Sequence, residues 1–433
     1  MKRLLLLLLA VLPFSARAQE NTFTLDADYL TRGELRIGGL FTEEGDPLNA
    51  RFILGRTRLG ATYSHSWLTA RLSAQHAGTW GSSAGSSLSM YDAWVQMRLP
   101  VGFFAKVGRQ ALAYDDERIF GSDDWSMTGM SHDGLKLGFE RAGHKIHLFG
   151  AYNQDVDNID EGGTRFSGGI QPYKSLTSAW YHYDIPKTNL GASLLWARIG
   201  MQSALVDEED PEGADKTHFQ QLAGVFLSWK PAWFGLETAY YHQWGTEQNG
   251  IPLNAWMASV KATATPSEHW SFRTGYDHLS GEEDFATPPQ GQIGLVHHDV
   301  VRGFSSLYGS NHKFYGAMDF FYVQSYVNGF TPGLQNYYAG VTWTPGKKRL
   351  SMDASYHFLS TAAPVEDARK DLGHEVELTA TWKIASSLSL SAGYSFMQGT
   401  ETMEILKRSS NKNRLQWAWL MLQVKPTFFS GKW

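Results

Sequence analysis

The sequence has no cysteine and only one long hydrophobic run. Because none of the 433 residues is cysteine, no disulfide can stabilise the fold, and the zinc and thiol chemistries that use cysteine are excluded. Charged residues make up only 19% of the chain. Beyond the first 18 residues, no segment approaches the roughly 20 apolar residues that a membrane-spanning helix needs. A membrane protein with this sequence must therefore cross the bilayer with strands.

The one hydrophobic run lies at the start of the chain. Lys2 and Arg3 precede the nine apolar residues 4–12, and Ala16-Arg17-Ala18 comes directly before Gln19. This is the three-part layout of a secretory signal peptide, and nine residues are too few to cross a hydrocarbon core of ~30 Å. We therefore expect cleavage near Gln19.

Cleavage there would separate a signal peptide, residues 1–18, from one exported domain, residues 19–433. The mature chain would carry 35 basic and 43 acidic residues, a net charge of −8, so no nucleic-acid partner is indicated. It is rich in aromatic residues (14%), which suits an outer membrane, where barrels carry aromatic girdles. A secreted β-sandwich or propeller is the alternative.

Period-two alternation recurs along the whole mature chain. In residues 375–383, Val376 and Leu378 alternate with Glu375 and Glu377, so one face is apolar and the other is charged. Segments of this kind are predicted at eighteen places: 23–38, 52–63, 67–76, 88–98, 102–110, 132–140, 144–153, 174–184, 189–198, 218–229, 233–244, 253–264, 270–279, 335–344, 349–358, 373–383, 387–397 and 414–425.

The connections between these segments alternate between short and long. Short ones, such as 64–66 and 141–143, carry turn residues, and long ones, such as 111–131 and 280–334, are rich in Gly, Ser, Asp and Glu. We therefore predict an all-β fold, a transmembrane antiparallel β-barrel of about 18 strands with long extracellular loops and short periplasmic turns. It would lie in the outer membrane of a Gram-negative bacterium, in contact with lipid.

The apolar stretch 304–323 lies inside the longest connection. One more spanning strand there would break the even strand number. We expect instead a loop that folds back over or into the lumen; a misassigned pair of strands is the alternative.

Inward positions of the early strands are rich in basic residues. A ring of such residues focuses positive potential in a narrow channel, which indicates a pore for anions. The alternative is that these side chains only pair with inward acids, such as those of the later strands at Asp277, Asp353, Glu375 and Glu377. The predicted pore-lining residues are Arg32, Arg36, Arg56, Arg58, Arg71, Arg98, Lys106 and Lys136.

Connection 111–131 and its flanks concentrate charge at the predicted pore mouth. We expect Arg109 and Arg118 to pair with its acids and so fix the loop. A Ca²⁺ ion is the alternative, since hard cations bind clustered carboxylates, but the spacing matches no EF-hand, so no metal or other cofactor is assigned. The predicted pore-mouth residues are Arg109, Asp115, Asp116, Arg118, Asp123, Asp124, Trp125 and Asp133.

Several short motifs resemble the alginate export porin family. The most specific are Val107-Gly108-Arg109-Gln110, Tyr114-Asp115-Asp116-Glu117-Arg118, Asp124-Trp125 and His132-Asp133-Gly134; Arg56-Thr57-Arg58-Leu59, Tyr308-Gly309, His312, Gly316, Asp319 and residues 372–378 are also similar. The resemblance implies an outer-membrane barrel of eighteen strands, whose arginine-rich constriction passes a polyuronate or a related anionic solute.

The expected function is a porin for anionic saccharides, by diffusion or export; whether periplasmic export partners exist stays open. An outer-membrane enzyme such as a lipid hydrolase is one alternative. We do not expect an enzyme, because the sequence has no Gly-x-Ser-x-Gly and no His-Glu-x-x-His motif. A receptor-type barrel plugged by connection 280–334 is the other alternative.

Overall fold

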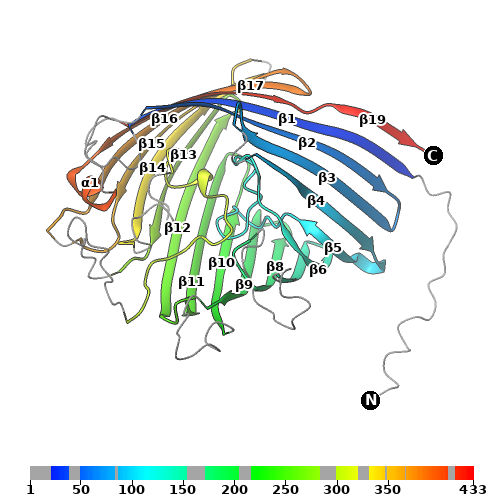
Figure 1. The fold of residues 1–433 in the computed structure, drawn as a ribbon, viewed down its shortest axis with the longest axis horizontal. Helices are drawn as coiled ribbons and strands as arrows, with labels where there is room; N and C mark the ends of the chain where they lie inside the picture. The colour runs from blue at the N-terminus through cyan, green and yellow to red at the C-terminus, as the bar shows by residue number, and fades with distance from the viewer. Residues whose placement is uncertain are drawn as a thin grey trace.

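A computed structural model describes residues 21–38, 49–82, 86–153, 171–203, 216–282, 299–319, 331–346, 349–365, 367–407 and 415–433. The predicted signal peptide lies outside these residues. The described residues form one antiparallel sheet (Figure 1), with the strands β1 (Thr22–Ile37), β2 (Ala50–Ser64), β3 (Leu68–Thr79), β4 (Ser87–Arg98), β5 (Phe103–Gln110), β6 (His132–Arg141), β7 (His144–Tyr152), β8 (Ser175–Ile185), β9 (Leu190–Gln202), β10 (Thr217–Trp229), β11 (Phe234–Thr246), β12 (Pro252–Ser267), β13 (Trp270–Leu279), β14 (Leu334–Trp343), β15 (Leu350–Ser360), β16 (Asp371–Ala385), β17 (Leu388–Gly399), β18 (Leu415–Val424) and β19 (Thr427–Lys432).

The sheet closes on itself through β1. One edge of β1 pairs with β2, and its other edge pairs with β18 and then with β19. The break between β18 and β19 falls at Pro426, which has no N–H to donate, so the two segments are successive parts of one wall strand. The predicted barrel of eighteen strands is therefore confirmed. The predicted last segment, 414–425, covers β18 but omits β19, which continues the same wall strand beyond Pro426.

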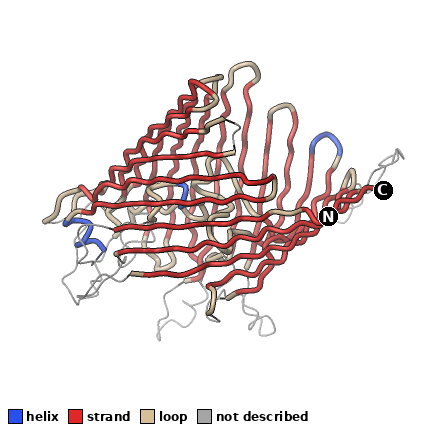
Figure 2. The backbone as a smooth tube through the Cα atoms, turned by 90° about the horizontal axis from the view of Figure 1, so that it is seen from above, coloured by secondary structure: helices blue, strands red, loops and turns tan. Residues whose placement is uncertain are grey.

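Short and long connections lie at opposite ends of the barrel. The short turns predicted at 64–66 and 141–143 are present, the second at Ala142 and Gly143, where both residues have positive φ. The two ends of the described chain meet at the short-turn end, where the Asn21 N–H donates to the Trp433 carbonyl over 2.9 Å. The tube view shows this arrangement (Figure 2). The seven-residue helix α1 (Glu401–Lys407) follows β17 at the long-loop end.

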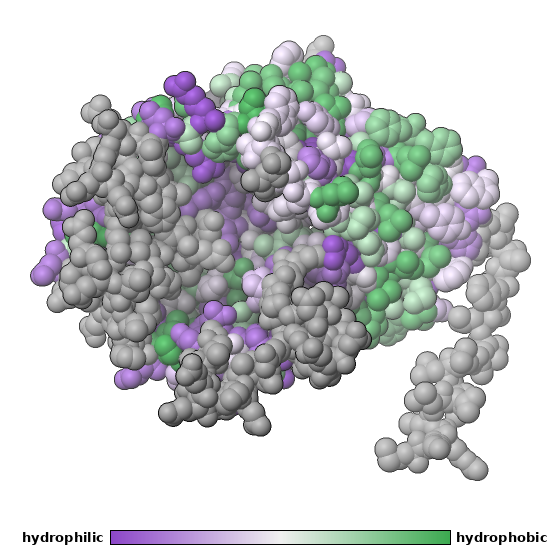
Figure 3. Space-filling view, in the orientation of Figure 1, coloured by the Kyte–Doolittle hydropathy of each residue, from purple (hydrophilic) through white to green (hydrophobic). Residues whose placement is uncertain are grey.

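The wall is apolar outside and polar inside. On β16, Val376 and Leu378 are 40% and 49% exposed on the outer face, whereas Glu375 points inward and is fully buried. In the space-filling view, hydrophobic residues cover much of the outer wall and hydrophilic residues gather in the hollow (Figure 3). No helix among the described residues is long and apolar enough to cross a membrane.

The described part of the apolar stretch 304–323 folds inward and adds no strand to the wall. Tyr308 forms an isolated parallel bridge with Phe120, and its N–H donates to the Ile119 carbonyl over 3.1 Å. Phe304 and Tyr315 are each 1% exposed. The expectation of an inward loop is confirmed for residues 304–319; residues 320–323 lie outside the described part of the chain.

A charge on the outer face should destabilise the barrel far more than the same charge inside. Leu378→Arg should lower the free energy of unfolding by about 2–4 kcal/mol, because its outward position at mid-strand would lie in hydrocarbon. Thr379→Arg, at the next position and facing inward, should lower the free energy of unfolding much less. Urea unfolding of both variants in phosphatidylcholine vesicles measures the difference, and equal costs would contradict the assignment of the two faces.

Candidate functional site

Two loops meet inside the barrel. The first inward loop, residues 111–131, connects β5 to β6, and the second inward loop, residues 299–319, lies between β13 and β14. Gly121 and Gly309 mark the contact, because a Cβ atom at Gly121 would lie 2.3 Å from Ser310 Oγ and one at Gly309 would lie 2.2 Å from the Arg118 carbonyl oxygen. Only glycine permits so close an approach, so these two residues allow the loops to pack together.

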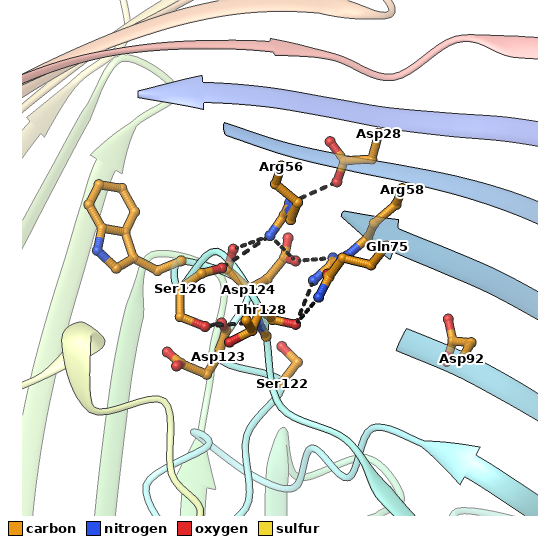
Figure 4. Close-up of polar contacts among 12 residues, drawn as sticks. Asp28, Arg56, Arg58, Gln75, Asp92, Ser122, Asp123, Asp124, Ser126 and Thr128 are labelled. Atoms are coloured by element: carbon orange, nitrogen blue, oxygen red, sulfur yellow. Dashed lines mark hydrogen bonds and ion pairs between the residues drawn. The ribbon is translucent and has the colours of Figure 1, made fainter. Parts of the chain in front are cut away.

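Two arginines of β2 hold the first inward loop against the wall (Figure 4). Arg56 Nη1 donates to the carbonyl oxygens of Asp124 and Ser126 over 3.0 and 3.2 Å. Arg58 Nη1 donates to the Asp124 carboxylate over 2.6 Å. Arg56 is only 1% exposed and Arg58 6%. Both guanidinium groups therefore lie behind the loop and do not line an open channel.

Wall residues occupy the other sides of these guanidinium groups. Arg56 Nη2 pairs with Asp28 of β1 over 2.9 Å, and Arg58 Nε donates to Gln75 of β3 over 2.6 Å. Gln75 in turn donates to the Thr128 carbonyl over 2.9 Å. The arginines thus tie three wall strands to one loop and have little free charge to offer a solute.

Trp125 joins both loops to the wall. Its ring stacks on His312 of the second inward loop, with centroids 4.2 Å apart, and the Arg32 guanidinium lies 4.0 Å from the ring centroid. Arg32 also donates to the Trp125 carbonyl over 3.1 Å and pairs with Glu34 over 2.8 Å. Arg32 is therefore another loop anchor, and its charge is neutralised.

Glu117 is the main ionic contact between the loops. Its carboxylate accepts a hydrogen bond from Ser310 Oγ over 2.7 Å and pairs with Lys313 Nζ over 2.7 Å. Burial alone would raise its pKa, but Lys313, Ser310 and the Ser122 N–H outweigh burial and hold the pKa of Glu117 below its usual value. The native contact therefore requires the ionised carboxylate.

Arg118 links the first inward loop to the opposite wall. It pairs with Asp116 of its own loop and with Asp277 of β13, each over 2.7 Å, and donates to Tyr315 Oη over 3.1 Å. Burial by itself would lower its pKa, but Asp277, Tyr315 and Asp116 outweigh burial and raise the pKa of Arg118 well above its usual value. The expected partnership of Arg118 with the acids of this loop is present, and Asp277 extends it to the wall.

The second inward loop covers the acids of β16. The N–H groups of Ala317 and Met318 donate to Glu377 and Glu375 over 2.6 and 2.9 Å. The remaining inward acids are paired within the wall, Asp353 with Arg273 over 2.6 Å and Glu237 with Lys230 over 2.7 Å. Glu237 also pairs with Lys261. The acids predicted for the later walls are thus neutralised or capped.

Three inward cations of neighbouring strands have no acidic partner within 4 Å among the described residues. Lys106 of β5 and Lys136 of β6 are directly opposite in the ladder, and Lys106 Nζ lies 3.8 Å from the Trp94 ring centroid. Lys136 Nζ lies 5.5 Å from the centroid of Tyr114. Arg98 of β4 donates to the Thr69 hydroxyl over 2.9 Å. Uncompensated positive charge therefore concentrates on the β4–β6 wall.

The structure divides the predicted pore-lining residues into two groups. Arg98, Lys106 and Lys136 present free charge to the lumen. Arg36 pairs with Glu34 over 2.8 Å, and Arg71 pairs with Asp26 and Asp92, while the other three are the loop anchors described above. Sequence alternation identified the inward face but carried no information about which cations the loops would cover.

Arg109 differs from its predicted role. It forms a bidentate pair with Asp133 of β6, at 2.9 and 2.6 Å, and contacts no acid of the first inward loop. By the alternation of β5 it lies on the same outer face as Val107, which is 50% exposed. Arg109 and Asp133 therefore join two wall strands from the outside, and the prediction that Arg109 fixes the pore-mouth loop is corrected.

The other acids of the first inward loop have separate partners. Asp115 accepts hydrogen bonds from Trp180 Nε1 at 3.2 Å, and burial raises its pKa. Burial also raises the pKa of Asp123, and its backbone N–H donates to Ser310 Oγ over 3.0 Å. Among the described residues, no group of three acidic or histidine side chains could hold a metal ion.

A Ser–His–Asp chain lies on the inner wall, and the sequence analysis did not find it. His182 of β8 contacts Ser193 Oγ at 2.8 Å and Asp184 at 2.9 Å. Ser193 is only 2% exposed, and it also hydrogen-bonds Asp115. Its neighbours in β9 are paired in the ladder on both sides, so no backbone N–H groups converge on it as an oxyanion hole. The geometry does not present a nucleophile.

Comparison with solved structures shows the same barrel architecture in Pseudomonas aeruginosa proteins. OpdL is 11% identical, with a TM-score of 0.62 over 94% of this chain and 99% of that chain. OccK11 (OpdR) is 14% identical, with a TM-score of 0.61 over 94% and 96%. OccK2 (OpdF), solved in complex with glucuronate, is 12% identical, with a TM-score of 0.61 over 94% and 98%.

At these identities the likeness shows the fold, a closed barrel of eighteen antiparallel strands. No family model and no curated protein matches the chain.

Removing the β2 anchors should release the first inward loop while the barrel stays folded. Arg56→Ala with Arg58→Ala removes several charge-assisted hydrogen bonds, each contributing about 1.5–3 kcal/mol. We expect protease cleavage within residues 122–128 and a larger single-channel conductance. Arg71→Ala is the matched control, because it breaks wall pairs without touching the loop. Wild-type cleavage in the double variant would contradict the anchoring role.

Acidification should loosen the contact between the two loops. Because the pKa of Glu117 is lowered in the folded state, its contribution is complete above the ordinary carboxyl pKa of about 4.3 and is lost as the pH falls through the lowered value. We expect quiet single-channel current at neutral pH and gating noise in strong acid. Glu117→Gln should be noisy at neutral pH as well; a quiet variant would show that Glu117 does not hold the loops.

Proposed function

We propose that this protein is an outer-membrane channel for small anionic solutes, and in particular for uronates. The observation that carries the proposal is the pair Lys106 and Lys136, inward, cross-strand and without an acidic partner among the described residues. Arg98 adds a third such charge on the next strand. An anion that enters the lumen therefore meets uncompensated positive charge on the β4–β6 wall.

The lysine pair is unfavourable without a counter-charge. Like charges directly opposite in an antiparallel ladder destabilise the pair, since their Cβ atoms are about 4.5–5.5 Å apart. A solute carboxylate between Lys106 and Lys136 would relieve this repulsion. The rings of Trp94 and Tyr114 lie beside the two ammonium groups and supply the apolar faces on which a sugar ring can stack.

The comparisons support a channel of this class. The similar barrels are outer-membrane porins of Pseudomonas aeruginosa, and one of them was solved with glucuronate, a sugar carboxylate. The signal-peptide layout and the apolar outer wall fit the same location, with the short turns in the periplasm and lipid against the wall.

Within this proposal, alginate-like polyuronates are the more specific candidate solutes. The motif resemblance around residues 107–134 supports them, and so does the chemistry of the lysine wall. Two inward loops that pack against each other favour single uronates or short oligomers over a wide polymer. Block of the current by monomeric, oligomeric and polymeric uronates, measured side by side, separates these solutes.

A plugged barrel is the second candidate, because buried side chains of both inward loops occupy the lumen. Conductance distinguishes it from a channel, since a plugged barrel would carry no steady current in a planar bilayer. An enzyme is disfavoured by the buried position of Ser193.

Neutralising the lysine pair should weaken anion preference. In Lys106→Gln with Lys136→Gln, we expect the anion-to-cation permeability ratio to fall by about fivefold, because the field on the β4–β6 wall is reduced. Reversal potentials under a KCl gradient measure the ratio, and glucuronate block should weaken in parallel. Lys187→Gln, in an exposed short turn, is the control for net charge. An unchanged ratio in the double variant would remove the lysine pair from the conduction path.

A further inference from the structure

The outer wall formed by β14 to β17 is hollowed, from the middle of β16 and β17 to the short-turn ends of β14 and β15. An apolar groove of about 360 Å³ has small residues at its floor and larger apolar residues at its edges. Its main lining residues are Trp343, Met352, Ala354, Leu378, Ala380 and Tyr394. By strand alternation these side chains share the outer face, so the groove opens away from the lumen.

A second hollow lies on the same strands toward the long-loop end. This rim pocket, of about 680 Å³, is lined by Gln335, Tyr337, Phe358, Ser360, Arg369, Lys370 and Asp371. Tyr337 of the rim pocket and Val341 of the groove are four residues apart on β14, which at about 3.3 Å per residue places the two hollows roughly 13 Å apart along the wall.

Each basic residue of the rim pocket makes one hydrogen bond or ion pair and retains further N–H donors. Lys370 Nζ donates one hydrogen bond to the Ala362 carbonyl over 2.9 Å and keeps two further N–H groups. Arg369 uses Nε on Asp371 over 3.1 Å, while its side chain is 88% exposed and its terminal N–H groups remain available. The Arg369 carbonyl accepts from Thr402 over 2.8 Å, which fixes the segment.

Aromatic rings border the rim pocket on the outer wall. Tyr337 packs against Tyr276 with centroids 4.6 Å apart and against Phe358 at 6.1 Å. Amphipathic rings of this kind lie at the level of lipid headgroups, with apolar surface below them and polar surface above. The rim pocket is therefore at headgroup level when the groove is at the level of acyl chains.

We propose that this face binds one anionic phospholipid, with an acyl chain in the groove and the phosphate at Arg369 and Lys370. The inference rests on the membrane location proposed above. Charge complementarity selects the occupant, because two cations against one acid, Asp371, among the described lining residues leave net positive charge beside an apolar groove. A lipid of zero net charge would fill the groove but leave the excess positive charge of the rim pocket uncompensated.

Native mass spectrometry of the refolded full-length mature protein tests the proposal. The protein is incubated in detergent with equal amounts of dilauroyl phosphatidate and dilauroyl phosphatidylcholine, and the detergent is then removed in the gas phase. We expect one phosphatidate to be retained in preference to phosphatidylcholine, and Arg369→Gln with Lys370→Gln to reduce that preference by about tenfold. Ala380→Phe, which fills the groove floor, should reduce retention of both lipids.

Arg141→Gln with Lys187→Gln, two exposed basic residues of the short turns, is the matched control and should keep the preference. Equal retention of the two lipids, an unaffected preference in Arg369→Gln with Lys370→Gln, displacement by excess inorganic phosphate, or a protein dimer in place of the lipid adduct would each overturn the proposal. Reversal potentials of the same preparations test the channel separately, so a missing lipid preference in an anion-selective channel refutes only this inference.

Discussion

Closure of the sheet through β1 is the constraint on which the rest of the structure depends. In hydrocarbon each unpaired backbone N–H or C=O costs several kcal/mol, so a sheet that spans a membrane must leave no open edge. Pairing of β1 with β2 on one side and with β18 on the other meets that requirement. A ring of eighteen strands encloses more space than wall side chains can fill, so the interior is left for loops and solute.

The two inward loops use most of the charge that the wall provides. On the β1–β3 side, buried arginines donate to the first inward loop, and on the β13–β16 side, acids accept from Arg118 and from the second inward loop. A buried charge is tolerated only when it is paired, so these contacts also account for the burial of Arg56. The lysine pair of β5 and β6, together with Arg98 of β4, has no acidic partner among the described residues, and the proposed selectivity follows from this uncompensated charge.

The sequence predicted the wall well and the interior poorly. Alternation of polar and apolar residues has a period fixed by the pleat, so all eighteen wall segments were located to within a few residues, and only the part of the last strand after Pro426 was missed. Alternation also identified Lys106 and Lys136 as inward.

Which inward charges stay free depends on loop contacts between residues far apart in the chain, such as Arg58 with Asp124, and period two contains no signal for these. Arg109 is a different case, because the alternation of β5 already places it on the outer face with Val107.

The absence of cysteine permits a direct test of the central claim, that the conduction path runs along Lys106 and Lys136 and not behind the first inward loop. Single cysteines are introduced as Lys136→Cys and Arg56→Cys, and each channel is exposed to an anionic thiol reagent during current recording. The account predicts rapid modification and current block for Lys136→Cys, slowed by glucuronate, with little reaction for Arg56→Cys. Rapid modification of Arg56→Cys together with an inert Lys136→Cys would contradict it.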